Sequence, residues 1–195
     1  MTATNPPDLA PDPEPDVAAW VGGRAIPLAE LDRRLDRLRA SDRACVLPNA
    51  QTREGRQLRR WVAHVLIAEQ LCVDELAARG LGWTGEELPG MPSPTDAVAL
   101  GSIVAAAWWG HPAVRRAAQE LTRAVRLPPA AIASAGRVGA TDTGELAWGL
   151  DELLAAARLD DFSRWLVRAV HERVVLVPGL EHPGDSSQPD NLHRH

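Results

Sequence analysis

The residues from Thr52 to Gly80 form the longest amphipathic stretch of the chain and constrain its fold more than any other feature. Apolar residues recur there at spacings of three and four, which predicts one continuous helix with a single buried face. Thr52 is a typical helix N-cap and Gly80 a typical C-terminal stop, so both ends of this helix are marked. The apolar face consists of Leu58, Val62, Val65, Leu66, Val73 and Leu76, with Trp61 and Cys72 at its edge.

One carboxylate, Glu69, falls in the middle of this apolar face, one turn after Val65 and one turn before Val73. A buried carboxylate must pair with a cation, take up a proton or face a wet cavity. Two interpretations follow: Glu69 is the partner of one of the many arginines, or it is a proton-transfer acid in a pocket. His64 lies away from the apolar face of the same helix, and we expect it to be exposed.

Composition limits the classes of function. The chain has 195 residues, of which 45% are hydrophobic, and this is ample for the core of one domain. The net charge of −5 argues against a surface that binds nucleic acid. No apolar run is as long as a membrane span, and the first residues do not have the pattern of a signal peptide. We therefore expect a cytoplasmic protein that binds neither nucleic acid nor membrane.

The chain as a whole predicts a mainly α fold with about five helices and one short two-stranded β pair. Residues 1–15 are rich in proline and acid, which predicts a disordered tail. Residues 16–177 are predicted to form a single helical domain, and residues 178–195 a polar tail that contains histidines.

The two predicted strands lie at opposite ends of this domain, at residues 17–21 and 173–177. A lone short strand is not stable, so we expect these two to pair and to join the N- and C-terminal ends. Besides the long helix, the sequence predicts helices at residues 28–40, 94–110, from 112 onward, and 143–172.

The order of these elements resembles the N-terminal domain of the SurA/PrsA-type foldases, in which a strand and turn enter one helix and a second helix follows. The residues that carry the resemblance are Val21, Gly22, Gly23 and Ile26, then Leu66, Ile67, Leu71, Cys72, Glu75 and Gly80. The family also returns its last helix and a closing strand onto this domain, as residues 143–172 and 173–177 are predicted to do. The resemblance implies a chaperone-like protein that binds a partner polypeptide.

The family usually carries a parvulin prolyl-isomerase domain before the returning helix. Here only about residues 128–142 stand at that place, too few for a catalytic domain. The resemblance therefore implies a binding protein without isomerase activity. The ending EHPGDSSQPDNLHRH is similar to small actinobacterial proteins found with aromatic polyketide pathways, which implies an accessory role in antibiotic biosynthesis.

An alternative function is that of a cyclase-type enzyme that binds a hydrophobic aromatic intermediate. Tryptophans either fill a core or line a pocket for a flat apolar ligand, and the candidates are Trp61, Trp108, Trp109 and Trp165. Glu69 and His111 are then the candidate catalytic acid and base, because His111 stands beside two indoles and imidazole titrates near neutral pH. The other interpretation of His111 is a residue that caps the following helix.

A second alternative is a protein that binds metal through its C-terminal tail. The candidate ligands are His182, His193 and His195, because a His-x-His pair can supply two nitrogen ligands to zinc or another divalent ion. The other interpretation is a solvated tail with scattered histidines. The sequence implies no other cofactor, and it leaves the oligomeric state open.

Overall fold

The computed structural model describes residues 16–42, 44–83, 93–135, 143–188 and 190. The tail predicted for residues 1–15 lies outside this part of the chain. The chain divides into two compact units, residues 1–67 with 173–195 and residues 68–172. We describe each unit by itself, and the single domain expected over residues 16–177 stays a prediction.

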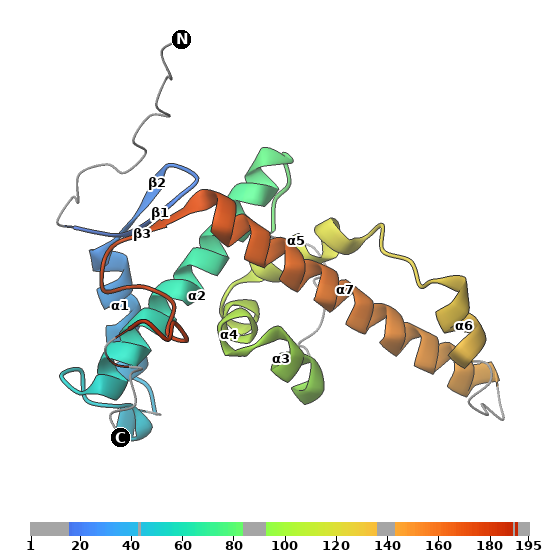
Figure 1. The fold of residues 1–195 in the computed structure, drawn as a ribbon, viewed down its shortest axis with the longest axis horizontal. Coiled ribbons are helices and arrows are strands. Elements are labelled where there is room, and N and C mark those ends of the chain that lie inside the picture. Colours follow the sequence, from blue (N-terminus) through green and yellow to red (C-terminus); the bar gives the residue numbers. More distant parts are fainter. Residues whose placement is uncertain (1–15, 43, 84–92, 136–142, 189, 191–195) are drawn as a thin grey trace, which may run out of the picture. The chain divides into compact units, whose positions relative to one another are not determined.

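The first unit contains a three-stranded antiparallel sheet in the order β2-β1-β3 (Figure 1). Its strands are β1 (Val17–Val21), β2 (Arg24–Pro27) and β3 (Val174–Leu176). Ala19 lies opposite Leu176 and Val21 opposite Val174, so the predicted pairing of the two chain ends is confirmed.

Strand β2 is an addition to the predicted pair, and two glycines explain it. Gly22 has φ 55° and Gly23 has φ 83°, a left-handed backbone that glycine adopts without strain. Two consecutive residues of this kind form the turn that matches the twist of a β-hairpin. Residues 24–27 therefore fold back along β1 and pair with it before the first helix begins.

Helices α1 (Leu28–Arg39) and α2 (Arg53–Ala78) follow, with the short 3-10 helix η1 (Ala44–Val46) between them. The Thr52 hydroxyl accepts a hydrogen bond of 3.1 Å from the backbone N–H of Gly55 and donates one of 2.8 Å to the carbonyl of Asn49. Thr52 thus caps α2 as its sequence predicts, and Gly80, at φ 68°, follows the end of the helix. The core of this unit includes Val21, Ile26, Leu31, Leu35, Val62, Ile67 and Leu180.

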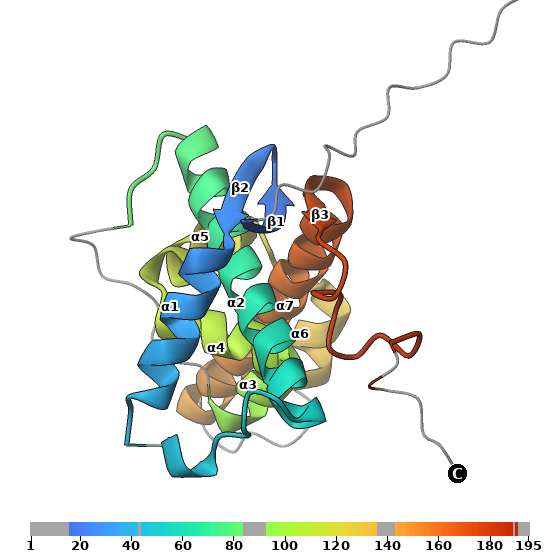
Figure 2. The same ribbon diagram turned by 90° about the vertical axis from the view of Figure 1, so that its left-hand side faces the viewer.

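The second unit begins within α2 and is helical. It contains α3 (Pro94–Leu100), α4 (Ser102–Gly110), α5 (Pro112–Thr122), α6 (Pro129–Ala135) and α7 (Thr143–Arg173), the last residue of which belongs to the first unit. Figure 2 shows these helices from a second direction. The core of this unit includes Leu71, Cys72, Leu76, Leu100, Ala107, Trp108, Val114, Phe162 and Leu166.

The single helix predicted for residues 94–110 is wrong, because α3 and α4 are separate. Gly101 lies between them at φ 78° and ψ 157°, a conformation that ends one helix and begins another. Ser93 caps α3 through a capping box with Asp96. The mainly α fold class is nevertheless confirmed, and the described residues hold seven α-helices because of this break and the short α6.

Gly55 allows a close approach between the start of α2 and the preceding loop. A Cβ atom placed on it would lie 1.9 Å from the carbonyl oxygen of Asn49. We expect Gly55→Ala to lower the free energy of unfolding by about 1–3 kcal/mol, because the loop must move.

At Gly149 of α7 a Cβ atom meets nothing within 4 Å. Gly149→Ala should therefore raise stability by about 0.5–1 kcal/mol. Urea unfolding followed by circular dichroism measures both, and equal effects would contradict this account.

Candidate functional site

Glu69 is buried, as its place on the apolar face of α2 predicts, with 6% of its surface exposed. It has an interaction partner in the structure. Cys72, one turn later, is fully buried, and burial together with the charges of Glu75 and Glu69 raises the pKa of its thiol. A thiol in these surroundings is inert as a nucleophile. This part of α2 is packed, and the catalytic role of Glu69 stays a prediction.

His111 is the N-cap residue of α5. Its Nδ1 accepts a hydrogen bond of 3.2 Å from the backbone N–H of Ala113, so this nitrogen carries no proton. The centre of its ring lies 6.0 Å from the centre of the ring of Trp83, at an angle of 52°. The imidazole is half-buried and already serves a structural purpose, as the capping interpretation predicts. Its acid–base role is a separate prediction.

Two of the four candidate tryptophans meet on one residue, Phe162 of α7. Trp108 is 5% exposed and meets Phe162 edge-on, with 6.2 Å between the ring centres. Trp165 stacks on Phe162 with 5.8 Å between the ring centres. Trp109 is 64% exposed, and Trp61 belongs to the other unit. Edge-on and stacked rings at these separations are the usual arrangement of a core. The structure therefore brings Trp108 and Trp165 together through Phe162, and each of them contacts protein.

The predicted metal ligands fall partly outside the described residues, because His193 and His195 are not among them. The Nδ1 of His182 accepts a hydrogen bond of 3.0 Å from the backbone N–H of Gly184, and its ring meets the ring of His64 edge-on at 5.0 Å. Within the described part of the chain, no group of three or more His, Cys, Asp or Glu residues is arranged to hold a metal ion. The zinc site stays a prediction.

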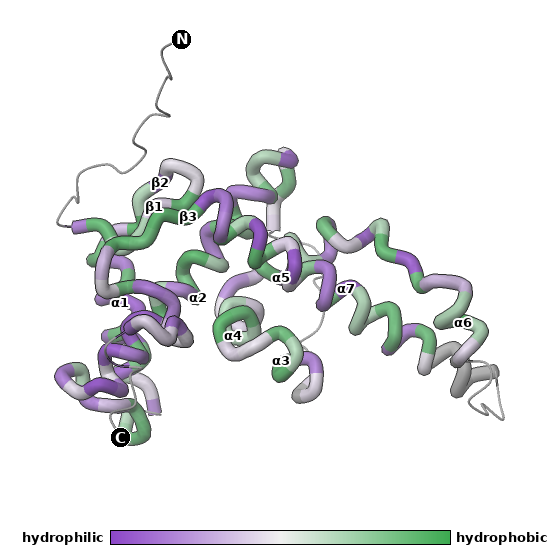
Figure 3. The backbone as a smooth tube through the Cα atoms, in the orientation of Figure 1, coloured by the Kyte–Doolittle hydropathy of each residue, from purple (hydrophilic) through white to green (hydrophobic). Residues whose placement is uncertain are grey.

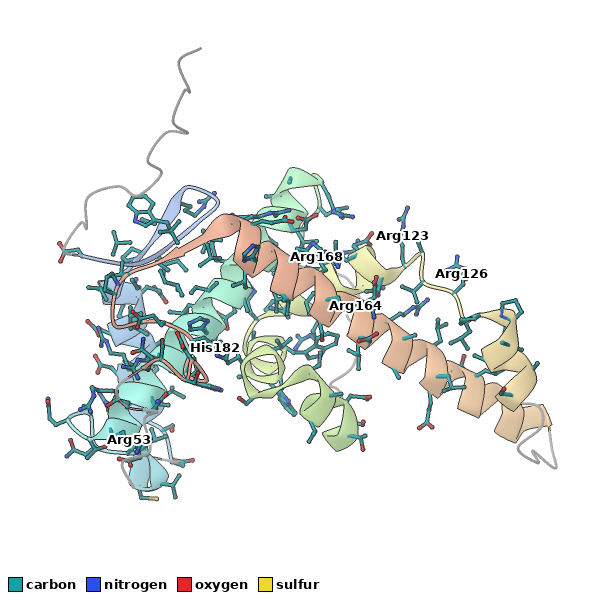
Figure 4. All side chains as sticks on the ribbon, in the orientation of Figure 1. Arg53, Arg123, Arg126, Arg164, Arg168 and His182 are labelled. Carbon is teal, nitrogen blue, oxygen red and sulfur yellow. The ribbon has the colours of Figure 1, made fainter. Side chains whose placement is uncertain are left out.

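Sequence reasoning missed a site on the first unit, where the chain folds back over α2 after strand β3. We call residues 178–188 with Asp190 the C-terminal clasp. Arg60 donates from Nε to the carbonyl of Gly179 at 3.1 Å, and His64 Nε2 lies 3.2 Å from the carbonyl of Leu180. Figure 4 shows His182 of the clasp beside α2. The prediction that His64 is exposed is wrong: the clasp covers it, and 6% of its surface remains exposed.

Asp190 anchors the far end of the clasp. Its two carboxylate oxygens accept hydrogen bonds from Arg56, at 2.6 Å from Nη2 and 3.1 Å from Nε. Arg60 Nη1 lies 3.0 Å from the same carboxylate. The Arg56 hydrogen bond, with a contribution from Arg60, lowers the pKa of Asp190 to about 2, and the pKa of Arg56 is raised in return.

One signal for this site was present in the sequence. Arg56, Arg60 and His64 follow one another at intervals of four residues, so they form one stripe on the side of α2 opposite its apolar face. A basic stripe on a helix is usually solvated, and nothing in its spacing identifies the segment that covers it. The covering residues lie more than a hundred positions further along the chain.

These features define a mainly α protein with a small antiparallel sheet that joins its two ends. Among the described residues, no helix combines the length and the apolar character needed to cross a lipid bilayer. A family of unknown function (DUF7158) matches residues 17–54, which include β1, β2, α1, η1 and the first two residues of α2. No curated protein and no solved structure matches the chain.

His64 predicts a dependence of stability on pH. Burial, and then the charge of His182, lowers its pKa from 6.5, although the carbonyls of Leu180 and Glu181 oppose this. The unfolded chain therefore takes up the proton first, so stability is complete above about pH 6.5 and falls as the pH drops below it. His64→Gln keeps a donor for the Leu180 carbonyl and cannot titrate. We expect this variant to lose less stability than the wild type between about pH 7 and pH 5.

Urea midpoints at the two pH values measure this difference. His171→Gln is the matched control, because His171 is exposed on α7. If the wild type and His64→Gln lose the same stability on acidification, the burial of a neutral His64 is not the cause.

The capping role of His111 predicts a contrast between two substitutions. His111→Ala removes the acceptor for the Ala113 N–H and should lower the free energy of unfolding by about 1 kcal/mol. Asparagine is a preferred N-cap residue, so His111→Asn should stay within a few tenths of a kcal/mol of the wild type. Thermal and urea unfolding measure both variants. Equal losses would show that the ring contact with Trp83, and not the cap, is what matters.

Proposed function

We propose that this protein is a chaperone-like accessory protein that binds a segment of a partner polypeptide and has no isomerase activity. The resemblance to the SurA/PrsA-type foldases supports this proposal, since that family also returns its last helix and a closing strand to an N-terminal strand. The pairing of β1 with β3 is what the resemblance implies. Only residues 136–142 separate α6 from α7, so an isomerase domain has no place there.

The observation that carries the proposal is a second apolar face on α7. One face is buried through Phe162, Leu166 and Ala169. The other lies on the first half of the helix, about a third of a turn around the axis. None of its residues is buried, and Leu153 is 44% exposed; the residues are Leu150, Leu153, Leu154 and Ala157.

Helix α6 lies near the beginning of α7 in Figure 1, and its Ile132 is 46% exposed. Together these residues define the α6–α7 surface: Ile132, Leu150, Leu153, Leu154 and Ala157. In Figure 3 green, hydrophobic stretches alternate with purple, hydrophilic ones along this part of α7. A group of partly exposed apolar side chains is typical of a surface that binds another polypeptide chain.

The charges around the α6–α7 surface favour one kind of partner. Asp151 and Glu152 on the same half of α7 are exposed, as is Asp160, which pairs with Arg164. One arginine, Arg158, is also exposed there, and the protein as a whole has a net charge of −5. An amphipathic helix with basic residues beside its apolar face would match both the apolar contacts and the acidic rim. The partner we propose is therefore a basic amphipathic segment. On the resemblance of the C-terminal sequence, we propose that this partnership serves a polyketide pathway.

A fluorescein-labelled peptide of leucine and lysine in a helical amphipathic pattern tests the proposal by fluorescence anisotropy. We expect saturable binding by the full chain. Leu153→Gln should weaken it by about tenfold, because a buried leucine contributes more than 1.4 kcal/mol. Ala155→Gln is the matched control: Ala155 is also exposed but lies on another side of α7, so binding should change by less than about twofold. Binding that does not saturate, or that both variants weaken equally, would refute the α6–α7 surface.

A further inference from the structure

We propose that Arg53, Arg56 and Arg60 on α2 form a binding site for an acidic, extended polypeptide segment of a partner, and that the C-terminal clasp occupies this site in the free protein. The site belongs to the first unit, and the inference does not depend on the α6–α7 surface. It rests on the geometry of Asp190, on the incomplete pairing of Arg60, and on the way in which α2 holds the backbone of the clasp.

The geometry around Asp190 is that of a carboxylate receptor. Arg56 donates hydrogen bonds from Nη2 and Nε to the two oxygens of the carboxylate, and Nη1 of Arg60 lies close to one of these oxygens. Bidentate contacts between a guanidinium and a carboxylate are the strong and specific form of this interaction. Arg56 and Arg60 are one turn apart on the same stripe of α2, so a regular helix brings both side chains to the same carboxylate.

Among the described residues, the clasp fills this receptor only in part. The side chain of Arg60 is 7% exposed, and its buried Nη1 has no aligned hydrogen-bond acceptor within the described residues, although the ion pair with Asp190 is close. In this part of the chain, two guanidinium groups face a single carboxylate, that of Asp190. Arg53, one turn before Arg56, is exposed at the start of α2 (Figure 4). A ligand with a second acidic group would satisfy this stripe better than Asp190 alone does.

The rest of the clasp shows why the ligand is a polypeptide. Arg60 Nε and His64 Nε2 contact the main-chain carbonyls of Gly179 and Leu180, which any residues would offer. Leu180 is the one buried side chain among the described residues of the clasp. The contacts therefore require two backbone carbonyls, one apolar side chain and, further along, one carboxylate. A partner segment with an apolar residue followed by acidic residues supplies the same groups.

The full-length chain with Asp190→Asn tests the inference, because this change replaces the carboxylate with an uncharged amide and leaves the three arginines in place. The probe is a fluorescein-labelled peptide with the sequence of residues 178–190, and its affinity is measured by fluorescence anisotropy. We expect the variant to bind the probe at least about tenfold more tightly than the wild type, whose own Asp190 competes. A second probe that carries Asn at its last position should bind the variant about tenfold more weakly than the first.

Substitutions on α2 identify the site in the Asp190→Asn background. Arg56→Gln should reduce the affinity by about tenfold. Arg59→Gln is the matched control, because Arg59 is on the same helix but lies off the stripe and pairs with Asp32, and it should change the affinity by less than about twofold. Circular dichroism confirms that each variant is folded.

Three results would overturn the inference: equal binding by the wild type and Asp190→Asn, equal binding of the two probes, or equal losses from Arg56→Gln and Arg59→Gln. Any of these would show that the clasp is only a structural tether or that the peptide binds by general charge attraction.

Discussion

Strand β1 is the element on which the first unit depends, because both of its edges are paired. β2 covers one edge through the glycine turn, and β3 covers the other after the chain has passed through all of the helices. The entropic cost of closing such a long loop grows only slowly with its length, so a short but buried strand suffices. Ala18 and Ala19, each 1% exposed, make β1 a core strand. The clasp begins two residues after β3, so the sheet also delivers the clasp to α2.

The clasp and Arg60 depend on each other for a reason of charge. A guanidinium taken out of water loses hydration, and only well-placed acceptors restore that free energy. The carbonyl of Gly179 accepts a hydrogen bond from Arg60 Nε, and the carboxylate of Asp190 supplies the opposite charge 3.0 Å from Nη1. If the clasp left without a replacement, Arg60 would have too few partners. Replacing the clasp with another acidic segment therefore costs less free energy than detaching the clasp from α2. The same argument explains why a partner must bring a carboxylate and not apolar groups alone.

Much of the fold could be predicted because its signals are local. Thr52 and Gly80 mark the ends of α2, and the apolar pattern between them gives the buried face. Gly101 was harder to interpret, since a glycine inside an apolar helical pattern can either be tolerated there or end the helix. His64 could not be placed from its own helix, because burial on that side is created by Leu180 and its neighbours far along the chain. The clasp therefore escaped prediction for the same reason: the pattern of α2 shows a basic stripe and not its cover.

The aromatic residues bear on the choice between a binding protein and an enzyme. An enzyme of the cyclase type needs the faces of its tryptophans free to stack on a substrate. Phe162 already takes up one face of Trp165 and the edge contact with Trp108, so a ligand that lay between these two tryptophans would have to displace a buried core residue. Displacing a fully buried phenylalanine costs as much as a large cavity in the core, about 3–5 kcal/mol. A partner chain on α6 and α7, or on the arginine stripe, requires no such loss, because the apolar and charged groups there are already at the surface or held by an exchangeable segment.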